Sequence, residues 1–139
     1  MKLVIDTNRI IAALIRNGTS RALITNSMFK FYSPDKVQEE ITQHNQEARE
    51  KSHLTEEQFK SVLKLLFEHI EVHPQEKYQS QLKEAESLIE DSADVPFIAL
   101  SLALENIPIW SDDAHFQHQK RIKVFTTSEL FKIASEEQK

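Results

Sequence analysis

The chain has 139 residues, a formal net charge of −5 at pH 7 and no cysteine. This length predicts a single domain, residues 1–139, with its own apolar core, and the absence of cysteine excludes disulfides, a thiolate zinc site and a cysteine nucleophile. The sequence shows neither a stretch of bilayer-spanning length nor a secretion signal, so we expect a cytoplasmic protein that does not enter the membrane. The acidic balance offers no broad basic surface, so a nucleic-acid partner would need cations to bridge the like charges.

The first third of the chain predicts two strands and three helices. Lys2–Ile5 is a continuous apolar run, typical of a strand buried on both faces of a parallel sheet. Helical patterning follows at 8–15 and at 21–29, and a second strand is expected at 30–33. Ser33 as N-cap and Pro34 at the first helical position then predict a helix that runs to about Glu50.

The rest of the chain continues this alternation. Thr55 and Gln58 have the spacing of a capping box, which opens an amphipathic helix over 56–70. We expect a weak strand at 70–74, helices at 76–89 and 95–104, and late strands at 107–110 and 124–126. Alternating strands and helices predict an α/β fold, a three-layer α/β/α sandwich around a mostly parallel sheet of four to five strands.

Acidic residues follow the predicted strands. Asp6 ends the first strand, and Asp112 and Asp113 follow the strand at 107–110. Asp94 opens a helix whose beginning is fixed by Pro96. Because ligands of such folds gather beyond the carboxyl ends of the strands, these acids lie at one edge if their strands are parallel neighbours.

A fourth acid follows from helix geometry. Val37 and Ile41 define the buried face of the helix that begins near Ser33. At about 100° per residue, Glu40 lies on the flank of that face while Glu39 points almost directly away. Glu40 is therefore the acid of this helix that can face a site.

Four segments carry a resemblance to a known family: "VIDTNRIIAAL", "SPDKVQEEI", "DSADVPFIALSLAL" and "PIWSDDAHF". In this order, and spanning nearly the whole chain, they resemble the PIN-domain nucleases, which include the VapC-like toxins of toxin–antitoxin pairs. The resemblance implies an acidic quartet of catalytic metal ligands, with polar support from Asn8 and Ser111. The quartet consists of Asp6, Glu40, Asp94 and Asp113.

The end of the last segment departs from the family pattern. Asp112 occupies the intervening position of a Ser/Thr-x-Asp element and is a further candidate metal ligand. Many relatives carry another acid two residues after Asp113, where this chain has His115, so the ligands of a second metal stay open. His115 and His118, like Glu90 and Asp91, are otherwise expected to be solvated.

The resemblance implies a metal-dependent endoribonuclease that leaves a 5′-phosphate and a 3′-hydroxyl. Hydrolysis of a phosphodiester needs a hydroxide and charge compensation on the phosphate, and carboxylate-bound Mg²⁺ or Mn²⁺ supplies both. The implied partners are an RNA substrate, a cognate antitoxin protein and a second copy of the chain in a homodimer.

Two other functions stay open. A phosphatase with Asp6 as nucleophile suits the strand-end position, but such enzymes want a second aspartate two residues on, where Asn8 stands. A PIN-like module without catalysis, which binds protein or RNA, is the other. Taken singly, Asp6, Asp94 and the Asp112–Asp113 pair are each also typical of caps and turns.

Overall fold

The computed structural model describes residues 1–137, and across them five short strands form one sheet. The strand order is β3-β2-β1-β4-β5, and all neighbouring strands are parallel. Because β1 lies between β2 and β4, the order reverses there, and a crevice is expected outside the carboxyl ends of β1 and β4. The strands are β1 (Lys2–Ile5), β2 (Lys30–Pro34), β3 (Ile70–His73), β4 (Ile109–Trp110) and β5 (Val124–Phe125).

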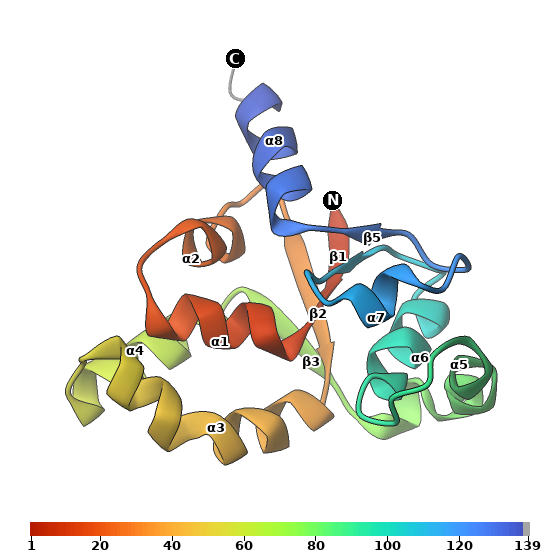
Figure 1. Cartoon of the computed structure of the whole chain (residues 1–139), viewed down its shortest axis with the longest axis horizontal. Coiled ribbons are helices and arrows are strands. Elements are labelled where there is room, and N and C mark those ends of the chain that lie inside the picture. The colour runs from red at the N-terminus through yellow and green to blue at the C-terminus, as the bar shows by residue number, and fades with distance from the viewer. Residues whose placement is uncertain (138–139) are drawn as a thin grey trace.

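Helices cover both faces of this sheet (Figure 1). One face packs against α1 (Thr7–Ile15), α2 (Thr19–Ile24), α3 (Lys36–Ser52), α4 (Glu56–Phe67) and α8 (Thr127–Glu137). The other packs against α5 (Leu82–Leu88), α6 (Val95–Ala103) and α7 (Ala114–Gln117). The predicted three-layer α/β/α architecture with a parallel sheet is therefore confirmed.

The central strand has the predicted burial on both faces. Leu3 and Ile5 lie in the core on the α1 side, whereas Val4 lies in the core on the α6 side. All three are 0% exposed. Alternate side chains of a strand point to opposite faces, so one apolar run fills both cores.

The predicted helix start at Ser33 and Pro34 is wrong. Strand β2 continues through Pro34, which lies opposite His73 of β3, and the helix begins only at Lys36. The backbone N–H of Asp35 donates to the carbonyl of His73 at 2.9 Å. Pairing with β3 therefore overrides the local cap signal, and proline is tolerated because it lies at the end of the strand.

Other boundaries also differ from the sequence prediction. The capping box of Thr55 and Gln58 is present. The helix expected at 21–29 spans Thr19–Ile24, and that expected at 76–89 begins as two 3₁₀ turns, η1 (Gln75–Lys77) and η2 (Gln79–Gln81), before α5. Between these turns Tyr78 is buried and its hydroxyl donates to the carboxylate of Asp35, a tertiary contact that a local pattern does not reveal. Helices α7 and α8 were not predicted.

None of the helices that the structure describes is both long and apolar enough to cross a bilayer.

Candidate active site

Asp6 lies at the junction of β1 and α1 and has two functions in the fold. Its Oδ1 accepts the backbone N–H of Asn8 at 3.4 Å as the N-cap of α1, and its Oδ2 accepts the hydroxyl of Ser111 at 2.7 Å. Burial raises the pKa of Asp6, while the hydrogen bonds from Ser111 and Asn8 act in the opposite direction. The same carboxylate is therefore a helix cap and a member of an acidic group.

Asp113 is joined to Asp6 through Ser111. The buried Ser111 hydroxyl donates to Asp6 and accepts the backbone N–H of Asp113 at 3.0 Å. Asp113 is itself the N-cap of α7, because its Oδ1 accepts the backbone N–H of His115 at 2.9 Å. Parallel pairing of β1 with β4 puts both aspartates at the same sheet edge, as the sequence predicts.

Glu40 reaches the same edge from α3. It is half-buried, and its Oε1 accepts the hydroxyl of Thr7 at 3.4 Å, directly beside Asp6 in the chain. Burial raises the pKa of Glu40, and the charge of Asp6 raises it further against the opposing bond from Thr7. Glu39 is exposed and lies 3.6 Å from Lys36 in a surface ion pair. The structure therefore brings Glu40, and not Glu39, to the group.

Asp94 is the member of the group with an unsatisfied oxygen. It stands at the N-cap position of α6, yet within the described residues its side chain makes no capping bond and its buried Oδ2 has no hydrogen-bond partner. Burial, followed by the charges of Asp91, Asp6 and Asp113, raises the pKa of Asp94 to about 7. A buried polar atom without a partner is costly, and a bound cation would satisfy it.

The four acids lie near enough for their charges to raise one another's pKa, but among the described residues the ligand atoms that all lie within 4.8 Å of one another belong to Asp91, Asp94 and His115. The charge of Asp113 raises the pKa of Asp6, that of Asp6 raises the pKa of Glu40, and both Asp6 and Asp113 raise that of Asp94. Like charges perturb one another in this way only at close range. Carboxylate oxygens are the ligands that Mg²⁺ and Mn²⁺ prefer, so the donor set fits such an ion.

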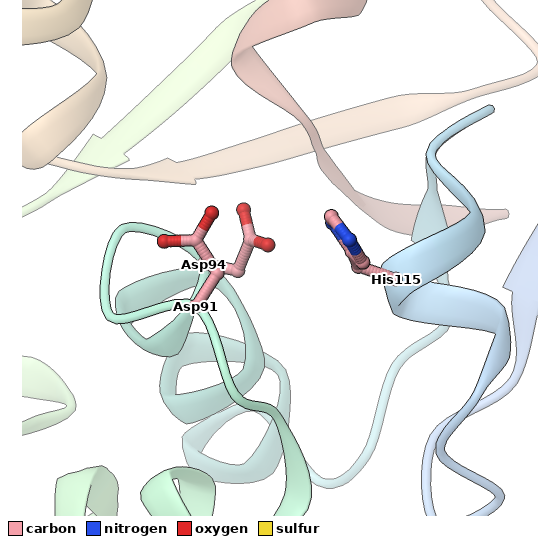
Figure 2. Close-up of side chains that lie close together, drawn as sticks. All are labelled: Asp91, Asp94 and His115. Carbon is pink, nitrogen blue, oxygen red and sulfur yellow. The ribbon is translucent and has the colours of Figure 1, made fainter.

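Asp91 and His115 lie beside Asp94 (Figure 2). One carboxylate oxygen of each aspartate and a ring nitrogen of His115 all lie within 4.8 Å of one another. Asp91 and His115 are exposed, as predicted, but their convergence on Asp94 was not predicted from the sequence. The only signal in the sequence came from the resemblance, which implies an acid at the position of His115.

Asp112 faces other partners. Its Oδ1 accepts the backbone N–H of Thr127 at 2.7 Å. Its Oδ2 accepts the Thr127 hydroxyl at 2.6 Å and lies 2.8 Å from Nη1 of Arg9. Both oxygens are thus engaged, so the ligand set proposed below omits Asp112.

A parallel sheet with carboxylates at its reversal point defines an α/β protein with an acidic sheet edge. The family model of the PIN domain matches residues 4–131, and the chain belongs to this family. PIN domains are generally metal-dependent nucleases.

A solved structure shares the fold. VapBC2 from Rickettsia felis, bound to a DNA fragment from its promoter, aligns with a TM-score of 0.63 and 17% sequence identity. The alignment covers 91% of this chain and 98% of that one. No curated protein matches the chain.

Proposed function

We propose that residues 1–139 form one nuclease domain that cleaves RNA internally with the help of Mg²⁺ or Mn²⁺. The ligands in this proposal are Asp6, Glu40, Asp94 and Asp113. The observation that carries it is the buried Oδ2 of Asp94, which within the described residues has no hydrogen-bond partner although it lies among like charges. Membership of the PIN domain family supports the same chemistry.

Neighbouring groups fix the orientation of two of the proposed ligands. Ser111 and the backbone of Asn8 hold Asp6 in one orientation, and Thr7 holds Glu40 beside it. When bound, the cation lowers the pKa of a coordinated water and neutralises charge on the phosphate. The carboxylates would hold the cation in place. Without a cation, their negative charge would repel the RNA backbone from the acidic edge.

The alternatives receive less support. As a phosphatase nucleophile, Asp6 would have to attack with a carboxylate that is buried and bonded to Ser111, and Asn8 occupies the place of the second aspartate. A module without catalysis does not account for the unsatisfied Oδ2 of Asp94.

The decisive experiment is RNA cleavage by the purified full chain in Mn²⁺, in Mg²⁺ and in EDTA. We expect cleavage with either or both ions, none in EDTA, and none from Asp94→Asn, because an amide ligates hard cations poorly. Glu84→Gln is the matched control, since it removes an exposed acid of α5 that belongs neither to the acidic group nor to its surroundings. Cleavage in EDTA, or wild-type turnover by Asp94→Asn, contradicts the proposal.

We further propose that this nuclease is the toxin of a toxin–antitoxin pair, with a cognate antitoxin protein and a second copy of the chain as partners. The resemblance to VapC-like toxins and the fold shared with VapBC2 support this proposal. Expression of the wild type alone is expected to arrest growth, whereas expression of Asp94→Asn is not. Size-exclusion chromatography with light scattering tests the homodimer.

A further inference from the structure

The group formed by Asp91, Asp94 and His115 combines donors from two separate segments. The aspartates belong to one turn, in which the backbone N–H of Asp94 donates to the carbonyl of Asp91 at 3.0 Å. His115 comes from α7, on the other side of the site (Figure 2). The donor atoms lie within 4.8 Å of one another, a span that one ion can bridge.

The ring of His115 lies beside the carboxylate of Asp113. Its Nδ1 lies 3.2 Å from Oδ1 of Asp113, the oxygen that also accepts the backbone N–H of His115. A carboxylate beside Nδ1 favours the proton on that nitrogen, which leaves Nε2 with a lone pair for a metal. Metal-binding histidines are commonly oriented by a carboxylate in this way.

The group also has a route to solvent and an unsatisfied atom. A cleft opens beside it, and the Oδ2 of Asp94 is buried without a hydrogen-bond partner among residues 1–137. The cleft is lined by Leu88, Ile89, Glu90, Asp91, His115 and His118. The cleft therefore gives an ion from solvent access to Asp91 and His115, next to Asp94.

We propose that Asp91 and His115 extend the ligand set around Asp94 and give the site a preference for Mn²⁺ over Mg²⁺. This inference rests on the proposed function, because Asp94 belongs to the same site. Mg²⁺ takes oxygen ligands almost exclusively, whereas imidazole suits the divalent transition metals. An imidazole among carboxylates therefore changes which ion is preferred rather than whether one is bound.

Electron spin-echo spectroscopy of Mn²⁺ on the full chain tests the ligand directly. We expect ¹⁴N modulation from the imidazole in the wild type, its loss in His115→Asp and its retention in His118→Asn. His118 is the matched control, since its ring packs edge-on against that of His115 with centroids 6.3 Å apart. Bound Mn²⁺ without ¹⁴N modulation in the wild type overturns the inference and leaves the proposed nuclease intact.

Calorimetric titration with Mn²⁺ and with Mg²⁺ tests the preference without any RNA. His115→Asp is expected to lower the ratio of Mn²⁺ to Mg²⁺ affinity about tenfold, and Asp91→Asn to weaken both ions. An unchanged ratio in His115→Asp overturns the inference. A wild type that binds neither ion overturns the proposed function as well, so the two failures are distinguishable.

Discussion

Two adjacent aspartates occupy opposite environments. Asp112 is fully engaged by Thr127 and Arg9, whereas Asp113 faces Asp6 and Asp94, whose charges repel its own. Both oxygens of the first carboxylate have donors, whereas the second carboxylate lies in a group of like charges that the proposed cation would neutralise. The comparison shows that neighbouring positions of the same residue type differ in their surroundings, because only Asp112 has an arginine partner.

The engaged aspartate belongs to a brace that joins three elements. Arg9 comes from α1, Asp112 follows β4, and Thr127 begins α8. Nε1 of Trp110 also donates to the Thr127 hydroxyl at 3.0 Å. We call Arg9, Trp110, Asp112 and Thr127 the α8 brace. It fixes the C-terminal helix against the sheet and turns Asp112 away from the acidic group.

The largest expected effect is a difference in cleavage rate between variants of Asp112 and Asp113. Asp113→Asn should lower the rate of RNA cleavage at least about 100-fold, because it removes a proposed metal ligand. Asp112→Asn should cost far less at a temperature where both variants are folded. Initial rates at several Mn²⁺ concentrations measure this difference. Rates in the reverse order would exchange the roles of the two residues.

The next effect is a difference in the free energy of unfolding between variants of Asp112 and Asp113. Asp112→Ala removes the ion-pair partner of Arg9 and the acceptor for Thr127, and should lower the free energy of unfolding by about 1–2 kcal/mol, which corresponds to a fall in Tm of about 3–8 °C. Asp113→Ala should lower it less, since the loss of a cap is offset by relief of repulsion. Chemical denaturation in EDTA measures both. Equal losses would mean that the α8 brace does not stabilise the fold.

A third comparison uses two neighbouring glutamates. Glu40→Gln should lower the cleavage rate at least about tenfold, because Glu40 faces Asp6 in the proposed ligand set. Glu39→Gln should change the rate less than about twofold, because Glu39 is exposed. Single-turnover cleavage of one RNA by both variants checks this. Similar losses of rate in the two variants would mean that Glu40 does not face the acidic group as the structure has it.

The smallest effect concerns pH and the metal-free fold. The pKa of Asp94 is raised to about 7, so between pH 4 and pH 7 the folded state binds more protons than the unfolded state. The free energy of unfolding should therefore fall as pH rises through this window, by about 1 kcal/mol once solvent screening of a half-buried group is considered. Melting curves in EDTA across this range measure the slope.

Asp94→Asn supplies the control for this titration. The variant should melt above the wild type in EDTA at pH 7, show a flatter pH profile and lose the stabilisation by Mn²⁺. For the wild type, 1 mM Mn²⁺ against a Kd of about 100 µM would add about 1.4 kcal/mol. A variant that melts well below the wild type in EDTA would identify Asp94 as a structural cap instead.

The sequence by itself determined the layered fold and the position of most of the acidic group. Apolar runs such as Lys2–Ile5 are local signals, and the parallel pairing that follows from them brings Asp6 and Asp113 to one edge. Helix periodicity distinguished Glu40 from Glu39 for the same reason, since side-chain direction in a helix follows from spacing alone.

Only the tertiary structure decided the features that depend on partners distant in sequence. Pairing with β3 extended β2 through Pro34, where a local cap pattern predicted a helix. Arg9 and Thr127 turned Asp112 away from the site, and the packing of α7 brought His115 to Asp94. A carboxylate pairs with the cation or hydrogen-bond donor that the fold brings close to it. The local sequence does not determine which partner that is.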